Sequence, residues 1–392
     1  MTAPAAPAAR PGRAPHLYSV DLVRILTFAC MIGVHVTSHT AADDDTGLYA
    51  LLGLLHFTRE VFFALSGFVL VLSYTYRPRP MRRFLPRRFL LVGVPYAVWS
   101  AIYFPFLLVR YPDGQSGWGV VGHFLLVLVT GQAWYHLYFL LVTMQVYVLL
   151  PVIIWLIHRT RGHHGPLLAA AAAFQLGLLA YYMYGQGIPA WVSGAEKTVF
   201  ISYIFVILLG AVAADHMPAA FGWVAGHRRL IAVLVTAAGL FTLGVFALQH
   251  YVFGMSRYHA GTPLQPVILL WGTAVAFGFL AFGSWWEQRR RPGSLSARSV
   301  AFASDISFGV YLVHPLVLWL LLSVGPDGHG WVPTVVPRPW LTLVVYLAVV
   351  AVSVTFVAVA RRTRASLPLT GRPRRHRRPA ERVEQVPARA EG

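Results

Sequence analysis

The hydrophobic positions of this chain fall into long runs, and polar residues gather between them. Each run is close to the ~20 residues that a helix needs to cross the hydrocarbon core of a bilayer. The runs are 17–38, 56–76, 89–109, 134–157, 167–184, 199–216, 230–249, 264–286, 302–324 and 341–360. The sequence therefore predicts an all-α polytopic integral membrane protein with about ten transmembrane helices.

The apolar stretch Trp118–Thr130 is too short to be a further span. A spanning helix needs ~20 residues, and this stretch is well below that length. Counting it as a span would also move the later basic loops to the outer side, although Lys and Arg gather on the cytoplasmic side of membrane proteins. We therefore expect an interfacial or re-entrant helix here.

Composition and charge agree with this class. Hydrophobic residues make up 57% of the chain, charged residues 12%, and the mean hydropathy is +0.60. The net charge of +18 comes from arginines beside the hydrophobic runs, which is the positive-inside pattern and not a nucleic-acid-binding surface. We expect a multi-pass plasma-membrane protein with the lipid bilayer as partner, no nucleic acid, and both termini in the cytoplasm.

Two polar tails flank the predicted transmembrane domain, 17–360. Residues 1–16 are rich in Ala and Pro, and residues 361–392 are rich in Arg without apolar periodicity, so we expect both to be disordered. The first run resembles a signal peptide only superficially, because it contains Arg24 and no small-residue cleavage pattern follows it. We expect it to be retained.

The first span carries two unusual residues, Arg24 and His35. At about 100° and 1.5 Å per residue, they share one helix face and lie about 16 Å apart along the axis. A charged residue inside a bilayer usually faces a protein interior or a cavity, and Asp21 at i,i+3 can pair with Arg24. The structural alternative is that Arg24 reaches the interface and that His35 is a hydrogen-bonded packing residue.

Further polar residues lie at the other membrane segments. Arg59 and Glu60, at the start of the second span, form either an interfacial ion pair, which we favour slightly, or part of a substrate entrance. Tyr311 and His314 are i,i+3 on the ninth span beside a helix-kinking Pro315, and they either hydrogen-bond between helices or line a cavity.

Other histidines carry a weaker signal. His136 stands among aromatic residues at the start of a span, as residues of an interfacial aromatic belt do. His163 and His164 lie in a short basic loop, where we expect them to be solvated. The chain has no Walker loop, no HExxH, no GxSxG with a triad order and no Cys/His metal spacing, so we expect no bound metal or cofactor.

The remaining residues permit acyl transfer. A neutral histidine in a partly dry cavity can take a proton from a hydroxyl as it attacks a thioester, or it can carry the acyl group itself. Arginines at a cytoplasmic rim can bind phosphate groups bidentately. This chemistry is allowed by the residues but not established by them.

The chain resembles the bacterial integral membrane acyltransferases of acyltransferase family 3. The resemblance rests on five stretches in the family's order: DLVRILTFACMIGVHV, FFALSGFVL, VPYAVWS, HLYFLLVTMQVYVLLPVI and SDISFGVYLVHPLVL. It implies transfer of an acyl group, usually acetyl from acetyl-CoA, to a hydroxyl of a carbohydrate or related acceptor. It further implies that His35 is the catalytic histidine and Arg24 its partner.

The donor site departs from the family's pattern. Many members carry an arginine pair three or four residues before the PY proline, where this chain has Leu91 and Val92. Arg87 and Arg88 are the nearest match, with Arg83 or Arg82 as the substitute for a missing second arginine. Tyr311 and His314 also match a family stretch, FGVYLVHP, which makes them candidates for the acceptor cavity. Arg59 and Glu60 are further candidates for the acceptor side, from their position at the start of the second span.

The sequence thus predicts a membrane O-acyltransferase that uses acetyl-CoA or another acyl-CoA as donor substrate. Its acceptor would be a carbohydrate or glycoside, such as a surface glycan precursor or a glycosylated metabolite. The main alternative is a transporter or flippase of a sugar or lipid-linked intermediate, in which Arg24 and His35 form a substrate or proton site. A noncatalytic scaffold is a third possibility.

Overall fold

The computed structural model describes residues 16–374 except 77, 79, 113, 115 and 325–329. The described residues form helices and no strand. Helices suit apolar runs of this length, because a membrane offers no water to pair backbone groups and a helix pairs them within itself. The long helices are α1 (Tyr18–Thr40), α3 (Thr58–Tyr76), α4 (Met81–Arg110), α6 (Tyr138–Arg159), α7 (His164–Tyr184), α11 (Arg228–Ala247), α13 (Val267–Arg289), α14 (Leu295–Ser323) and α16 (Arg338–Ala360).

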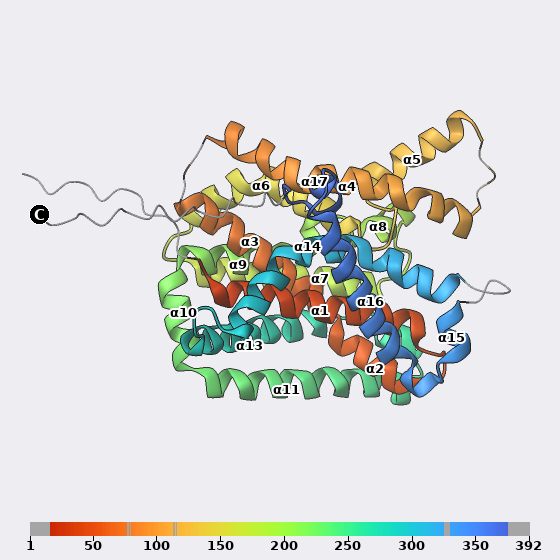
Figure 1. Cartoon of the computed structure of the whole chain (residues 1–392). Coiled ribbons are helices and arrows are strands. Elements are labelled where there is room, and N and C mark those ends of the chain that lie inside the picture. The colour runs from red at the N-terminus through yellow and green to blue at the C-terminus, as the bar shows by residue number, and fades with distance from the viewer. Residues whose placement is uncertain are drawn as a thin grey trace, which may run out of the picture.

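Shorter helices connect or extend these. They are α2 (Thr46–Leu55), α5 (Trp118–Thr130), α8 (Ala190–Ala195), the 3₁₀ turn η1 (Phe200–Tyr203), α9 (Ile204–Asp215), α10 (Met217–Gly226), the π-helical turn η2 (Leu248–Val252), α12 (Arg257–Ala260), α15 (Trp331–Val335) and α17 (Ser366–Thr370). Figure 1 shows α1, α13 and α11 packed side by side along the bundle.

The expected membrane architecture is confirmed. Among the described residues, nine helical segments are long and apolar enough to cross a membrane, and a tenth span results if the bent pair α9 and α10 counts as one. This pair, with its preceding turn η1, falls on the predicted span 199–216 and bends by 98° after Asp215. The short helix α5 has the predicted bounds and stays below spanning length.

Two boundaries differ from the sequence prediction. The acidic loop after the first span leads into α2, which joins α3 in one apolar segment, Thr46–Tyr76. Asp45 caps α2 by accepting a hydrogen bond from the backbone N–H of Leu48 at 2.9 Å, a signal that the run of aspartates hid. Helix α4 begins at Met81, well before the predicted Phe89, and it contains Pro86.

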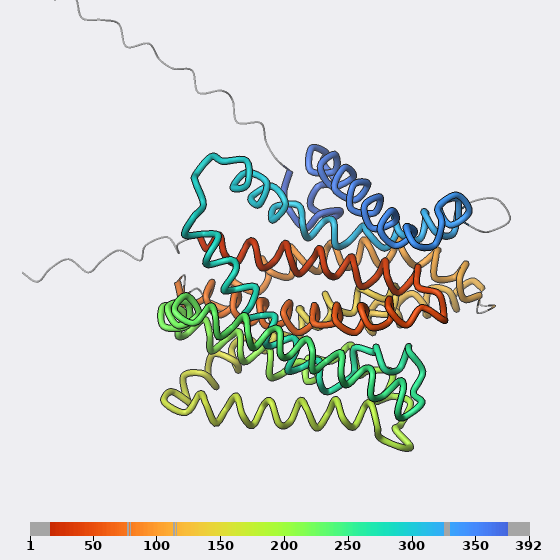
Figure 2. Tube along the Cα trace, turned by 90° about the horizontal axis from the view of Figure 1, so that it is seen from below, coloured from red at the N-terminus to blue at the C-terminus, as the bar shows by residue number. Residues whose placement is uncertain are grey.

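The helices divide into a buried centre and an exposed periphery. In α1, the α2–α3 segment and α14, 61% of the most apolar window is buried inside the protein, against 11% in α7 and 28% in α16. Figure 2 shows α7 and α16 on opposite edges, with α1 between them. Arg24, His35, Arg59, Tyr311 and His314 belong to these central helices, whose most apolar windows are mostly buried inside the protein.

The start of the C-terminal tail is ordered, contrary to the prediction of disorder from Arg361. The Arg361 side chain is buried, and its guanidinium pairs with Asp305 of α14 at 3.2 Å and donates to the Pro373 carbonyl at 2.6 Å. Helix α17 follows and ends at Gly371, which has φ +66° and lies against Phe308. The composition of the tail suggested solvation, but the buried ion pair fixes residues 361–374. The predictions for 1–15 and 375–392 lie outside the described residues.

Helices α3 and α9 approach each other through glycines. A Cβ added to Gly210 of α9 would overlap with the backbone carbonyl of Ala64, and one added to Gly67 of α3 would overlap with the carbonyl of Ile207. Small residues of this kind let membrane helices pack backbone to backbone. This contact holds α9 against the central helix that carries Arg59 and Glu60.

We expect Gly210→Ala to lower the stability of the folded protein by about 1–3 kcal/mol or more, as overpacking of a close helix contact does. The matched control is Gly244→Ala on α11, where a Cβ meets no heavy atom within 4 Å; it should be neutral or stabilising by about 0.5–1 kcal/mol. Thermal unfolding of the purified protein in detergent measures both. Equal midpoints for the two variants would contradict the close contact.

Candidate active site

Two neighbouring cavities meet inside the bundle. The first, of about 270 Å³, is lined by Arg24, Arg88 and Arg372, and we call it the arginine cavity. The second, of about 310 Å³, is lined by His35, His136 and Arg59, and we call it the histidine cavity. The side chains of Phe139 and Tyr311 line both, so they form the wall between them.

Arg24 is held by a polar network at the start of α1. Its guanidinium lies 3.3 Å from the Asp21 carboxylate, which confirms the expected i,i+3 pair, and 3.3 Å from the Ser304 hydroxyl of α14. Ser304 in turn donates to Asp21 at 2.7 Å. The network fixes Arg24 toward the arginine cavity and away from the bilayer, so Arg24 and His35 serve different cavities and do not touch.

The arginine cavity contains one arginine that the sequence predicted and one that it did not. Arg88 lines the cavity, donates to Ser73 at 2.7 Å and stacks over Phe84. Arg372, which follows α17, enters the same cavity beside Leu91 and Val92, the positions that lack arginine in this chain. The predicted Arg83 and Arg87 are exposed and lie outside this cavity.

His35 occupies the histidine cavity at the far end of α1 from Arg24. Its ring stacks on His314 with a centroid separation of 5.3 Å and lies 4.8 Å from the ring of Tyr135. Among the described residues, no group hydrogen-bonds to either ring nitrogen of His35. The half-buried imidazole therefore has a lone pair and an N–H available for a ligand in the cavity.

His136 is part of this cluster, and its assignment to an interfacial belt is wrong. Its side chain is 2% exposed and packs against the rings of Tyr103, Tyr311 and His314. Neither ring nitrogen makes a hydrogen bond of good geometry with the described residues. The flanking aromatic residues suggested a membrane surface, whereas packing by α4 and α14 buries His136. His136 opens the HLYFLLVTMQ stretch of the family resemblance, and this stretch was the sequence signal for a role of His136 in the site.

Pro315 determines how the ring of His314 is oriented. A proline has no N–H to donate to the carbonyl four residues earlier, that of Tyr311, and the Nδ1 of His314 lies 2.7 Å from this carbonyl oxygen and donates to it. The donation leaves the Nε2 of His314 with a free lone pair, and Nε2 has no hydrogen-bond partner among the described residues. One helix break thus orients a fully buried histidine beside His35.

Tyr103 of α4 bridges the next pair of backbone groups at this helix break. Its hydroxyl donates to the Leu312 carbonyl at 2.8 Å and accepts from the backbone N–H of Leu316 at 3.1 Å. Tyr311 donates from its own hydroxyl to the backbone carbonyl of His136. Tyr311 therefore makes a hydrogen bond to another segment, as one interpretation expected, and it also lines both cavities, as the other did. The hydrogen bond of His314 stays within α14, and His314 is absent from the lining of both cavities.

Arg59 and Glu60 form a buried pair at the edge of the histidine cavity. Arg59 lies 3.5 Å from Glu60, donates to the Pro263 carbonyl and sits over the ring of Tyr203. Glu60 is 2% exposed, so the pair is internal and not interfacial. Arg59 itself lines the cavity, whereas Glu60 is absent from its lining.

A third cavity, of about 420 Å³, continues from the histidine cavity, and we call it the outer cavity. The two share His39, Tyr135, Tyr138 and Lys197. Arg110, Glu196 and Trp319 are further residues of its lining. It combines aromatic surfaces with charged and amide groups, a composition that suits a polar ligand with hydroxyl groups.

Of the two loop histidines, His163 is exposed, as expected, but His164 is buried. The Nδ1 of His164 lies 2.8 Å from the Nε2 of His216. This contact joins positions 52 residues apart, which no local pattern around His164 could reveal.

Comparison with known proteins gives one match. The family model described as an acyltransferase domain matches residues 17–359, nearly the whole transmembrane region. No curated protein and no solved structure matches the chain.

We expect Tyr103→Phe to lower stability by about 1–3 kcal/mol, because it leaves the Leu312 and Leu316 backbone groups without their hydroxyl partner. In a Pro315→Ala background the helix can close its own bonds, so the same substitution should cost less. The control Tyr111→Phe removes an exposed hydroxyl and should change stability by no more than about 0.5 kcal/mol. Thermal unfolding of the four variants measures this coupling; an equal cost of Tyr103→Phe in both backgrounds would contradict it.

Proposed function

The chain belongs to this acyltransferase family and is a membrane acyltransferase, and from that premise we propose that it transfers an acetyl group from acetyl-CoA to a hydroxyl of a carbohydrate. The observation that carries this proposal is the pair of cavities divided by Tyr311 and Phe139, with arginines on one side and histidines on the other. Family membership favours this function over a transporter or flippase.

The arginine cavity suits the phosphates of coenzyme A. Arginine binds phosphate oxygens through two parallel N–H donors, and the cavity presents Arg24, Arg88 and Arg372. Asp21 balances Arg24 alone, while Arg88 and Arg372 have no carboxylate partner among the described residues. We therefore assign the donor phosphates to Arg88 and Arg372, in place of the expected Arg87 and Arg83, and take this side as cytoplasmic because the arginine-rich loops lie there.

The wall between the cavities suits the passage of a thioester. Phe28, Phe62 and Phe139 contact one another or Tyr311 with ring centroids 4.2–5.9 Å apart. This aromatic wall is apolar on the donor side, so it would exclude water from the acyl chain. An acyl-pantetheine arm that passes it reaches the cavity of His35.

His35 serves as general base in this proposal. Its free nitrogen takes the proton of the acceptor hydroxyl while the oxygen attacks the thioester carbonyl, and the proton then passes to the departing coenzyme A thiolate. The buried His314 stacks on its ring and limits how the ring can turn. A histidine that carried the acyl group would instead release coenzyme A without any acceptor.

The acceptor enters from the outer cavity. Its lining includes Arg110, Glu196 and Lys197, which can bind hydroxyl groups, and the rings of Tyr135 and Trp319, which can pack on the apolar face of a sugar. A surface glycan precursor or a glycosylated metabolite fits this class of acceptor.

The alternative donors are longer acyl-CoA esters, which the same phosphate contacts would bind.

Acetyl-CoA turnover by purified protein, presented with a panel of glycan and glycoside acceptors, tests the assignment of His35. We expect acceptor-dependent release of coenzyme A by the wild type and a loss of about 10²–10⁴-fold in kcat for His35→Ala, the size of a general-base contribution. His158→Ala, which removes an exposed histidine at the end of α6, should keep full activity.

Each outcome has a defined meaning. Release without acceptor by the wild type, with an acyl group retained on the protein, would assign His35 as carrier instead of base. Equal activity of His35→Ala and His158→Ala would reject the histidine cavity as the reaction site. Failure of the wild type to bind acetyl-CoA would reject the donor assignment.

Arg372→Gln tests the donor cavity. Hydrogen bonds to charged groups contribute about 1.5–3 kcal/mol, so the KM for acetyl-CoA should rise about tenfold or more while kcat changes little. The exposed Arg364 precedes α17 and lies outside the arginine cavity, which makes Arg364→Gln the matched control with an unchanged KM.

Acetyl-pantetheine lacks the phosphates of acetyl-CoA, so its turnover distinguishes a loss of phosphate binding from damage to the fold. Wild type and Arg372→Gln should use it equally well if Arg372 binds phosphate. A loss of acetyl-pantetheine turnover in Arg372→Gln would show that the substitution damages the fold or the chemistry, and an unchanged KM for acetyl-CoA would remove Arg372 from the donor site.

A further inference from the structure

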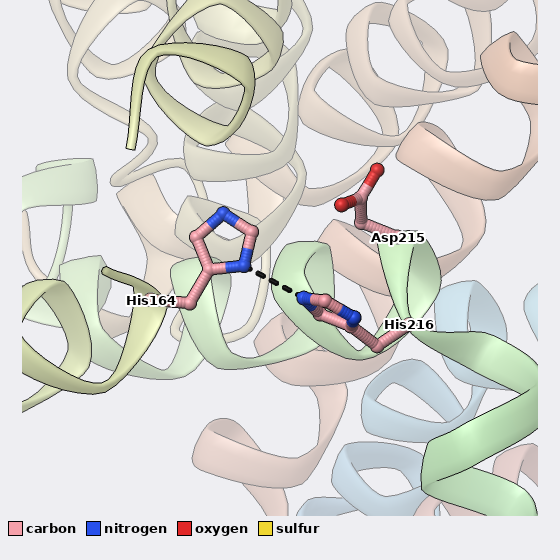
Figure 3. A group of neighbouring side chains, drawn as sticks. All are labelled: His164, Asp215 and His216. Atoms are coloured by element: carbon pink, nitrogen blue, oxygen red, sulfur yellow. Dashed lines mark hydrogen bonds between the residues drawn. The ribbon is translucent and has the colours of Figure 1, made fainter. Parts of the chain in front are cut away.

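A second polar cluster lies at the bend between α9 and α10, away from both cavities of the active site. His164 begins α7, Asp215 ends α9, and His216 joins α9 to α10. Figure 3 shows a hydrogen bond between a ring nitrogen of His164 and one of His216, with the carboxylate of Asp215 to one side. One nitrogen from each histidine and one carboxylate oxygen all lie within 4.8 Å of one another. None of the three residues lines the arginine, histidine or outer cavity.

The hydrogen bonds of His164 prepare it as a ligand. Its Nε2 lies 2.9 Å from the backbone carbonyl oxygen of Ile157, which can only accept, so Nε2 carries the proton. In the neutral ring the lone pair is then on Nδ1, and Nδ1 points at the Nε2 of His216 at 2.8 Å. Metal-binding histidines characteristically donate their other N–H to a carbonyl or carboxylate in this way.

We propose that His164, Asp215 and His216 bind a divalent transition-metal ion of the zinc class. Two histidine nitrogens and one carboxylate oxygen are ligands that zinc accepts at about 2.0–2.2 Å. Donors at this distance in a tetrahedral site lie roughly 3.3 Å apart, so the two nitrogens open slightly and the carboxylate moves inward. His216 is exposed and Asp215 half-buried, so water completes the coordination.

The competing interactions around the cluster are weak. Arg161 lies 3.9 Å from Asp215, but its side chain is 65% exposed, and surface pairs of this kind contribute only about 0–1 kcal/mol. Without a metal, the two imidazoles share a single hydrogen bond. A bound cation would pair with the carboxylate in place of Arg161. The neutral His216 would then carry its proton on Nδ1, which leaves the Nε2 lone pair of His216 and the Nδ1 lone pair of His164 for the metal.

A metal at this site would stabilise the packing of α7 against the bent pair α9 and α10. Asp215 and His216 flank the 98° bend, while His164 belongs to the peripheral helix α7. A metal would fasten α7 to this bend. Helix α9 also contacts the central α3 through Gly210 and Gly67, so the metal would hold α7 and α9 on the central helix that carries Arg59.

Zinc and cobalt binding to the tag-free, full-length protein in detergent tests the proposal. Zinc content after equilibration and desalting, and a competition titration with a zinc indicator, give stoichiometry and affinity; Co²⁺ gives a visible spectrum that reports its ligands. We expect one Zn²⁺ per chain and a rise in the unfolding midpoint on adding Zn²⁺. Removing a group that only hydrogen-bonds to a metal ligand typically costs about 10–100-fold in metal affinity. His164→Ala and His216→Ala remove ligands themselves, so each should weaken Zn²⁺ binding by more than that, and Asp215→Asn should also weaken it.

Two variants serve as controls. His163→Ala removes the exposed neighbour of His164 and should keep the wild-type stoichiometry and affinity. Arg161→Gln removes the competing exposed cation and should tighten Zn²⁺ binding without affecting the fold.

The proposal is overturned by any of three results. These are substoichiometric binding by the wild type at micromolar Zn²⁺, equal losses in His163→Ala and His216→Ala, and no change in the unfolding midpoint of the wild type with Zn²⁺. The last measurement needs no substitution at all, so a variant that fails to fold does not weaken the test. Acyl transfer is measured separately, and its failure has no bearing on the metal count.

Discussion

Polar groups inside this apolar bundle must pair with one another or face a cavity, because the membrane interior offers no water to satisfy them. The arrangement around Pro315 follows directly from that constraint. The proline leaves the Tyr311 carbonyl without its helix partner, and His314 satisfies it at 2.7 Å; the Tyr103 hydroxyl then bridges the next pair of backbone groups. The same bonds that repair the helix also fix the ring that stacks on His35.

The position of Tyr311 connects this repair to the separation of the two cavities. Its ring belongs to the wall between arginine and histidine sides, and its hydroxyl is bound to the backbone of His136. In the proposed function, a donor with several negative charges and an acceptor with hydroxyl groups differ in solvation, and separate cavities would let each be bound by suitable groups. The thioester would be the part of that donor that crosses the aromatic wall at little cost in desolvation.

The sequence predicted those features that depend on local periodicity. The spans, the short helix α5, the i,i+3 pair of Asp21 and Arg24 and the place of Pro315 within its helix all follow from spacing along one segment. It failed where burial depends on distant segments. His136 looked like a belt residue until α4 and α14 enclosed it, and His164 looked solvated although its partner is 52 positions away. The roles of His35 and Arg24 remain predictions, supported by their cavities.

The order of residues 361–374 also depends on a distant segment, because the composition of the tail gave no sign of it. Thirty-two residues with many arginines should be solvated, yet Arg361 is buried against Asp305 and draws the chain back to the bundle. The pair joins a buried guanidinium to a half-buried carboxylate of α14, so it links the tail to a central helix. Gly371 then turns with a positive φ where a side chain would collide with Phe308, and this turn delivers Arg372 to the arginine cavity. In the proposed function, the second donor arginine is therefore supplied by tertiary packing after the last span and not by the sequence before the PY proline.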